Sequence, residues 1–341
     1  MKYILLSLVL ASIFLWGCAK ATDPLENVDV VTVERIYETV GIPEDMIITD
    51  AVIYVAEDQA GFSIFDRTAG ALASRITMQD DFIHLSNIKQ LGYAEYYQKL
   101  FVFDRYGPTR ILVYSVEDIY NPQWIHQIIG GDLASINYLE INNYEDGNIE
   151  LSIANTNSIF RYGEILPPGS EEPYFLALQQ YPMPNAIRKF HIVDQYAYFA
   201  GAQRGMYIFD MESRTLLSEL NMTGDALDIR VKGDYAYIVA KQEGLLIADI
   251  SDKSNPVWLE ENSLSTVGWA QAIDLESDYL VVGSGSGGVY LYDIGQDPAR
   301  PRLLQRIPSS VVDYVLLVEI KDSKIFVAGR YQGITVLNIN R

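Results

Sequence analysis

Few side chains in this sequence have the types and spacing that enzyme chemistry needs. The chain has three histidines, His84, His126 and His191, and its only cysteine is Cys18. No HxH or HExxH spacing brings zinc ligands together, no GxSxG segment presents a nucleophilic serine, and no phosphate-binding P-loop occurs. Two of the histidines lie inside apparent strands and the third precedes one, which favours structural roles. The sequence therefore identifies no catalytic residue and no metal ligand, and an enzyme is the less favoured class.

A different set of polar residues recurs in short segments that each precede a glycine. Four of these segments carry a cation, although the chain as a whole is acidic, with a net charge of -20. Guanidinium groups, amides and aromatic rings are groups that bind carboxylated sugars or acidic peptides. The alternative is that the segments are polar only because they face water. The candidate ligand-binding residues are Arg105, Tyr106, Gln203, Arg204, Lys241, Gln242, Arg330, Tyr331 and Gln332.

These polar segments belong to an internal repeat that predicts paired strands. Each copy has an apolar run, a polar loop, a glycine and a second apolar run, and an Asp or Asn follows the glycine by five residues. The β-branched and aromatic runs indicate strands, and the glycine suits a hairpin position with positive φ. The Asp or Asn is expected to cap a tight turn. The cleanest copies are Ala51–Asp66, Tyr196–Asp210, Tyr235–Asp249, Tyr279–Asp293 and Lys324–Asn338.

The spacing of the copies predicts seven units. Successive repeat glycines from Gly205 to Gly333 are separated by 39, 44 and 45 residues, and Gly61 lies 144 residues before Gly205, or three intervals of 48. Two degenerate copies fill that interval: Lys99–Asp104 with Ile111–Ser115, and Ile149–Ala154 with Ser158–Tyr162.

Flanking strands complete each unit. One is expected before each pair, such as Ala226–Lys232, and one after it, such as Val257–Glu261. Four-stranded units at this period are typical of a β-propeller. We therefore predict an all-β, seven-bladed propeller that forms a single domain over residues 28–341.

The two ends of the chain are expected to close the ring. The last repeat stops at Arg341 without a following strand, whereas a β-rich segment, Val30–Tyr37, precedes the first repeat. Pairing of this segment with Gly333–Asn338 would complete the seventh blade. In such a ring the loops between second and third strands emerge on one face, so the candidate ligand-binding residues should gather near the channel mouth.

The repeat resembles that of the LVIVD-repeat family of bacterial and archaeal propellers. The resemblance rests on Tyr-Ala-Tyr-Ile-Val-Ala from Tyr235, a loop, Gly-Leu-Leu-Ile-Ala-Asp-Ile-Ser-Asp from Gly244 and the pair Asn255 and Pro256, and it covers roughly Ala51–Arg341. It implies the propeller architecture and an extracytoplasmic setting. It implies no catalytic residues, because the residues of the motif are structural.

The first residues resemble a bacterial lipoprotein signal. A short basic start precedes the apolar run Tyr3–Trp16, which is too short to span roughly 30 Å of hydrocarbon comfortably. The run ends in Leu-Trp-Gly-Cys, similar to a lipobox except that Trp16 replaces the usual small residue. The resemblance implies a signal peptide over 1–17, lipidation of Cys18, a polar tether over 18–27 and delivery to the outer membrane. A plain secretory signal or an uncleaved anchor helix are the alternatives.

Charge and repeat together favour a binding protein. The excess of acids should repel phosphate backbones, which argues against nucleic-acid binding. We expect a non-enzymatic, membrane-anchored binding or scaffold propeller for an envelope protein, a peptide or a glycan, without a cofactor. One alternative is a structural subunit of an outer-membrane assembly. Another is a calcium-assisted hydrolase or lactonase at the central channel, although residues 142–148 lack the spacing of a calcium-binding loop.

Overall fold

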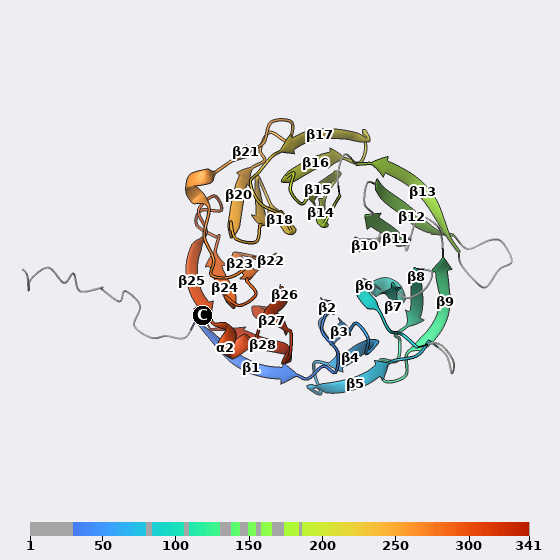
Figure 1. Ribbon diagram of the computed structural model, residues 1–341. Helices are drawn as coiled ribbons and strands as arrows, with labels where there is room; N and C mark the ends of the chain where they lie inside the picture. The colour runs from blue at the N-terminus through green and yellow to red at the C-terminus, as the bar shows by residue number, and fades with distance from the viewer. Residues whose placement is uncertain are drawn as a thin grey trace, which may run out of the picture. The chain divides into compact units, whose positions relative to one another are not determined.

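The computed structural model confirms the predicted architecture. It describes residues 30–79, 84–105, 109–129, 138–143, 149–154, 158–165, 174–183 and 186–340. The predicted signal peptide 1–17, Cys18, the tether 18–27 and Tyr106 lie outside the described residues. The chain divides into Met1–Val30 and Val31–Arg341, and the described strands of the second unit form seven four-stranded antiparallel sheets in a ring (Figure 1). No helix among the described residues is long and apolar enough to cross a membrane.

The first four blades follow one another along the chain. Blade 1 contains β2 (Asp45–Ile48), β3 (Val52–Ala56), β4 (Phe62–Asp66) and β5 (Ala71–Ile76), and blade 2 contains β6 (Ile88–Ala94), β7 (Lys99–Asp104), β8 (Arg110–Ser115) and β9 (Gln123–Ile129). Blade 3 contains β10 (Tyr138–Asn143), β11 (Ile149–Ala154), β12 (Ser158–Ile165) and β13 (Tyr174–Pro182), and blade 4 contains β14 (Lys189–Val193), β15 (Tyr196–Ala200), β16 (Met206–Asp210) and β17 (Thr215–Leu220). Both degenerate repeats therefore form blades.

The remaining blades complete the ring. Blade 5 contains β18 (Asp228–Lys232), β19 (Tyr235–Val239), β20 (Leu245–Asp249) and β21 (Val257–Trp258), and blade 6 contains β22 (Ala272–Glu276), β23 (Tyr279–Gly283), β24 (Val289–Asp293) and β25 (Arg302–Ile307). Blade 7 contains β26 (Val315–Lys321), β27 (Lys324–Gly329), β28 (Gly333–Ile339) and β1 (Val31–Tyr37). In every blade the first of these strands lies nearest the axis (Figure 1).

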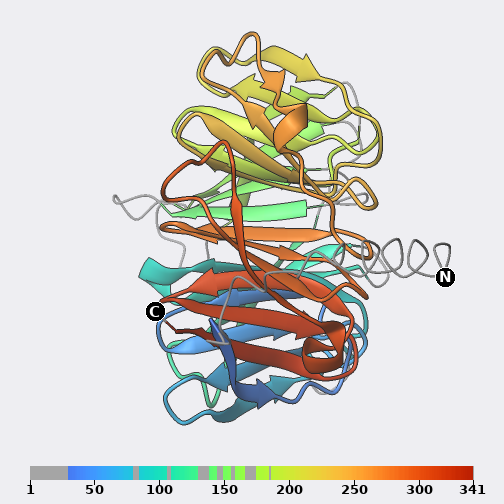
Figure 2. The same ribbon diagram turned by 90° about the vertical axis from the view of Figure 1, so that its left-hand side faces the viewer.

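Blade 7 closes the ring as the sequence predicts. Strand β1 pairs antiparallel with β28, from Val31 opposite Ile339 to Tyr37 opposite Ile334. The start of β1 thus lies beside the end of the chain, at the face opposite the β27–β28 loop. Figure 2 shows the C-terminal end on that side of the ring. The chain therefore enters blade 7 from the face that does not carry the loops between second and third strands.

The repeated glycine and aspartate have the predicted backbone roles. Gly244 has a φ of 78°, and a Cβ there would lie 2.3 Å from the carbonyl oxygen of Leu264. The Asp249 Oδ1 atom accepts a hydrogen bond from the Ser251 backbone N–H at 2.9 Å. Hydrogen bonds from Ser251 hold the pKa of Asp249 below its ordinary value. Positive φ angles recur at Gly61, Gly205, Gly288 and Gly333.

The outer strand of blade 5 is shorter than predicted. It ends at Trp258 rather than Glu261, because the chain then turns into the 3-10 helix η3 (Glu260–Asn262). Leu264 afterwards exchanges two backbone hydrogen bonds of 2.9 Å with Leu245, so this part of β20 remains paired without a regular outer strand.

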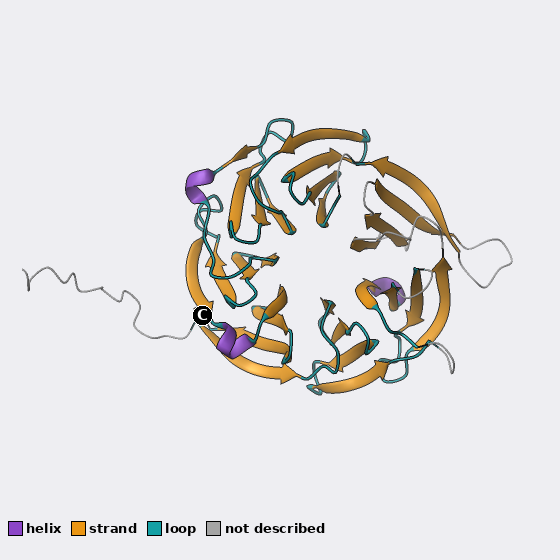
Figure 3. Ribbon diagram, in the orientation of Figure 1, coloured by secondary structure: helices purple, strands orange, loops and turns teal. Residues whose placement is uncertain are grey.

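The apolar core lies between neighbouring blades rather than inside any one sheet. One cluster joins Tyr54 and Phe62 of blade 1 to Leu100, Val102 and Leu112 of blade 2. Each sheet buries both faces against its neighbours, as expected for strands with nearly continuous apolar runs. The colours of Figure 3 show how little of the ring is helical.

Candidate functional site

The loops between the second and third strands of a blade lie against the next blade. Isolated backbone bridges fix four of them to the start of the following first strand: Asp58 with Ile88, Ala202 with Ala226, Lys241 with Ala270 and Gly285 with Val315. These loops therefore share one side of the ring, which we call the loop face. The positions of eight of the nine candidate ligand-binding residues on this face are described, and they do not form a single cluster.

Three candidates meet in one cavity of about 470 Å³. Gln203, Lys241 and Gln242 line it together with Asp225 and Trp269. The residues come from the β15–β16 and β19–β20 loops and from the connections that lead into β18 and β22. We call this the Trp269 cavity. Trp269, with 49% of its surface exposed, is its aromatic wall.

The carboxylate of Asp225 in the Trp269 cavity is shared by two cations, and the Arg188 Nη2 atom lies 3.9 Å from its Oδ2 atom. The Lys241 Nζ atom lies 2.6 Å from the Asp225 Oδ2 atom and 5.8 Å from the centre of the Trp269 ring. The other carboxylate oxygen of Asp225, Oδ1, is buried and accepts no hydrogen bond from any described residue. The cavity therefore combines an exposed aromatic face, two amides, the Lys241 ammonium group paired with Asp225, and a buried carboxylate oxygen that accepts no hydrogen bond from the described residues.

Arg330 and Tyr331 line a second and separate cavity of about 660 Å³, with Gln59 and Arg75. Tyr331 is 82% exposed, and the Arg330 guanidinium carbon lies 5.7 Å from its ring centre. The backbone N–H groups of Tyr331 and Gln332 donate to the Asp313 Oδ2 atom, which fixes the loop. This cavity retains the exposed cation and aromatic ring that the sequence predicts for an acidic ligand.

The last two candidates lie apart from both cavities. The Arg204 guanidinium is 3.7 Å from Glu219 Oε1, and both side chains are accessible to solvent. The Arg105 guanidinium carbon lies 5.8 Å from the centre of the Phe103 ring. Sequence reasoning missed Asp225 as a site residue because nothing in the repeat marks it: it precedes β18 by three residues and meets Lys241 only in the folded ring.

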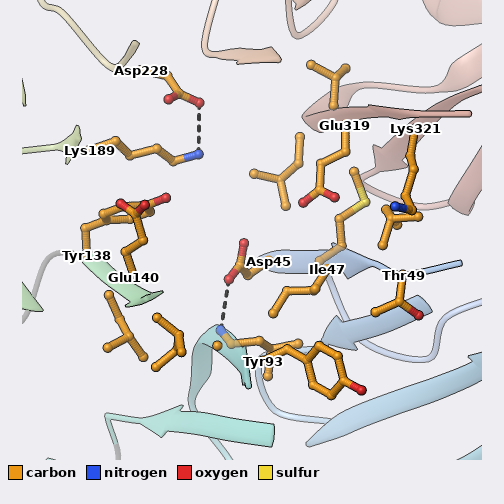
Figure 4. Close-up of a pocket in the computed structure, with 18 of the residues that line it drawn as sticks. Asp45, Ile47, Thr49, Tyr93, Tyr138, Glu140, Lys189, Asp228, Glu319 and Lys321 are labelled. Carbon is orange, nitrogen blue, oxygen red and sulfur yellow. Dashed lines mark hydrogen bonds and ion pairs between the residues drawn. The ribbon is translucent and has the colours of Figure 1, made fainter. Parts of the chain in front are cut away.

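The central channel holds a second concentration of polar groups. A cavity of about 330 Å³ follows the first strands, as Figure 4 shows. The free inner edges of these strands would leave backbone N–H groups without partners. Side chains of the preceding blade supply them: Asp45 Oδ2 accepts from Leu91 N–H at 2.9 Å, and Asp274 Oδ2 accepts from Ile320 N–H at 2.9 Å. These carboxylates fasten one blade to the next.

An ion network surrounds Asp228 at one end of this channel. Lys189 Nζ and Arg230 Nη1 each lie 3.0 Å from the Asp228 carboxylate, and Arg230 Nε lies 3.0 Å from Asp274 Oδ1. Burial opposes ionisation of Asp228, but Lys189 and Arg230 outweigh it and hold its pKa below the ordinary value. The network therefore links the inner strands of blades 4, 5 and 6.

Three other channel carboxyls, those of Glu140, Asp45 and Glu319, form no ion pair with any described residue. Burial raises the pKa of Glu140 to about 7, with only the distant charge of Arg230 opposing it. Burial raises the pKa of Asp45 to about 6 against the hydrogen bond from Leu91. Burial and the charges of Asp274 and Asp45 raise the pKa of Glu319 well above its usual range. Burial near the axis therefore destabilises the ionised forms of these three carboxyl groups.

The histidine of the channel has a structural partner. His191 Nδ1 accepts a hydrogen bond from the Val231 backbone N–H at 3.1 Å, and burial, with the charge of Arg230, lowers its pKa to about 4. It therefore fastens blade 4 to blade 5 as a neutral ring. Among the described residues, no group of three or more His, Cys, Asp or Glu side chains is placed to hold a metal ion.

Comparisons with known proteins agree with this architecture. The family model of the LVIVD repeat matches residues 223–261, which contain all four strands of blade 5. No curated protein sequence matches the chain.

Solved structures share the fold at low identity. The crystal structure of RRP9 WD40 repeats has a TM-score of 0.69 at 14% identity and covers 91% of this chain and 97% of that one. The Swd1 β-propeller domain from Myceliophteria thermophila has a TM-score of 0.66 at 10% identity, covering 91% of this chain and 100% of that one. The computationally designed protein Ika8 has a TM-score of 0.64 at 12% identity, over 90% and 99%. The chain is a seven-bladed β-propeller that contains an LVIVD repeat.

Proposed function

We propose that this protein is a lipid-anchored, extracytoplasmic binding propeller that holds a neutral glycan in the Trp269 cavity. The observation that carries the ligand assignment is the buried, unpartnered Oδ1 atom of Asp225 beside the exposed ring of Trp269. A sugar hydroxyl would donate to this oxygen while a sugar ring packs on the indole. Gln203 and Gln242 would add amide donors and acceptors.

The internal ion pair favours hydroxyl groups over carboxylates as ligands. Because Asp225 already neutralises Lys241, a carboxylated ligand entering this cavity would gain little from the ammonium group and would meet an oxygen of like charge. A hydroxyl group both donates and accepts hydrogen bonds, so it can satisfy Asp225 Oδ1 and Lys241 together. This refines the sequence-based expectation of an envelope protein, peptide or glycan to a glycan.

A titration with neutral tetrasaccharides tests the glycan assignment. Maltotetraose, cellotetraose and chitotetraose would be added to the protein while tryptophan fluorescence and binding heat are recorded. We expect at least one to bind, and Trp269→Ala to weaken it by roughly tenfold or more, since each 1.4 kcal/mol is tenfold in affinity. The matched control is Trp124→Ala, which removes a tryptophan of similar exposure from β9. Equal affinities in the two variants would refute the assignment.

The anchor proposal rests on Cys18 and on the direction of β1. Strand β1 starts at the face opposite the loop face, so the chain enters the propeller on the side away from the Trp269 cavity. Two or more acyl chains give stable membrane binding. Incorporation of a labelled fatty acid into the wild type, with none in Cys18→Ser and release of that variant into the soluble envelope fraction, is the expected result; equal membrane retention would contradict it.

The calcium-assisted hydrolase remains the alternative at the channel, but the described residues fit calcium poorly. Asp45 and Asp274 are engaged by backbone N–H groups and Asp228 by two cations, so these carboxylates do not converge on one ion. A thermal scan with and without a chelator distinguishes the two functions: a binding propeller of this kind should unfold at the same temperature in both.

A further inference from the structure

The channel cavity has more carboxylates than cations on its wall. Among the described residues, six acids line it against three bases: Asp45, Asp50, Glu95, Glu140, Asp228 and Glu319 against Lys189, Arg230 and Lys321. All three bases are already paired, Lys189 and Arg230 with Asp228 and Lys321 with Asp50 at 2.9 Å. The wall therefore has more acidic than basic groups. A cation that enters this partly enclosed space would favour the ionised forms of Glu140 and Glu319, whose pKa values burial raises, and ionic attraction there is stronger than in water.

Glu140 and Glu319 are the acids away from solvent that this excess leaves without partners among the described residues, since Asp45 accepts from Leu91 N–H and Glu95 is exposed. Within the described part of the chain neither forms an ion pair, and the Oε2 atom of Glu140 is buried without any hydrogen bond. Glu140 comes from β10 and Glu319 from β26, and Figure 4 shows them on opposite sides of the cavity. A buried carboxylate oxygen with no donor points to a donor that the protein itself does not supply.

The arrangement suits an elongated cation rather than a compact one. The free acids stand on separate strands, and no group of three among the described residues is placed to surround a metal ion. The wall between them is apolar in part, with Ile47, Leu91 and Leu317. About 330 Å³ is enough for an unbranched chain of methylene groups with charges at intervals.

We propose that the channel binds a linear polyamine whose separated ammonium groups pair with Glu140 and Glu319 while its methylene groups pack on the apolar wall. Each terminal ammonium group is a compact donor of three hydrogen bonds and each internal one a donor of two, which matches single carboxylates better than a bidentate guanidinium does. This site is independent of the Trp269 cavity, and its ligand differs in charge and shape from a neutral glycan.

Calorimetric titration of the full chain with spermidine tests the proposal. We expect saturable one-to-one binding, with propylamine, which carries a single charge, at least tenfold weaker. Glu140→Gln and Glu319→Gln should each weaken spermidine binding about tenfold or more, and the double variant should abolish it. Both substitutions keep side-chain shape, and a thermal scan checks that the variants are folded.

A matched control separates this site from general attraction to an acidic protein. Glu261→Gln removes one negative charge from an exposed side chain outside the cavity and should leave spermidine affinity unchanged. The proposal is overturned if spermidine produces no saturable binding, if the double variant binds it as tightly as the wild type, or if calcium binds at the same site with equal strength.

Discussion

The turns of the blades and the inner wall of the channel differ in how far their residues repeat from blade to blade. At the turns of five blades the same residues recur, a glycine with positive φ followed five residues later by Asp or Asn. At the middle register of the first strands no two blades match in a way that defines a motif. The residues there, each opposite a middle residue of its second strand, are Ile47, Gly92, Glu140, His191, Arg230, Asp274 and Glu319.

The repeated turn residues therefore build these five blades, whereas the channel residues differ from blade to blade. In the five blades with a clear repeat the turn requires the same backbone conformation, so glycine occupies the same position each time. The channel wall brings seven strands together once, so each position meets different neighbours. Some channel residues, such as Asp274, still stabilise the fold by linking blades, whereas Glu140 and Glu319 have no such partner in the part of the chain that the structure describes. Substitutions can test that distinction directly.

Removal of Asp228 should have the largest effect on stability. Asp228→Ala would leave Lys189 without its carboxylate and Arg230 with Asp274 alone, all in the buried end of the channel. Loss of one partner from a buried ion pair costs about 3 to 5 kcal/mol. Chemical denaturation should show this loss. Asp278→Ala, which removes the exposed partner of Lys232, should cost less than about 1 kcal/mol. Similar losses in both variants would show that the channel network is not structural.

A methyl group on a repeated turn glycine should have the next largest effect. Gly244→Ala would force an alanine to a φ of 78° with its Cβ 2.3 Å from the Leu264 carbonyl oxygen, so that the backbone must move. We expect a loss of about 2 to 4 kcal/mol in the free energy of unfolding. Gly233→Ala is the matched control, because its φ is also positive at 58° but nothing lies within 4 Å of the added Cβ. An equal loss at both positions would mean that strain in φ, and not the close approach, decides the cost.

Much of the fold could be predicted from sequence because the turns repeat. Gly61 and Asp66 have the same spacing as Gly244 and Asp249, so a local rule of backbone geometry is visible five times in one chain. Closure by β1 could be predicted because the last repeat lacks a fourth strand. The early end of β21 could not, since Leu264 replaces the strand only through a non-local pairing with Leu245.

The candidate site was less predictable because ring geometry decides which loops meet. Lys241 and Gln203 share a cavity, whereas Arg330 lies in another, although all three occupy equivalent loops. Asp225 neutralises Lys241 from the connection into β18, which carries no repeat signal. The pairing of the channel charges depends likewise on neighbouring blades, so their partners are not evident from spacing along the chain.

Replacement of Glu140 should produce a smaller change, of opposite sign and dependent on pH. The pKa of Glu140 is raised to about 7 in the folded protein from 4.5, so the folded state retains a proton that the unfolded state loses as the pH rises between these values. Its contribution to stability is present below about pH 4.5 and is lost by about pH 7.

Glu140→Gln has no carboxyl group at this position to titrate, so the variant does not lose this stability as the pH rises. Relative to the wild type, the variant should therefore be near neutral at pH 4 and more stable by on the order of 2 kcal/mol at pH 8. Tyr138 on the same strand stays neutral and Arg230 on β18 stays charged over this range, and Glu261→Gln should show no such trend. Denaturation curves at pH 4, 6 and 8 measure the difference, and a variant less stable than wild type at pH 8 would show that Glu140 has a structural partner and is not held in readiness for a cationic ligand.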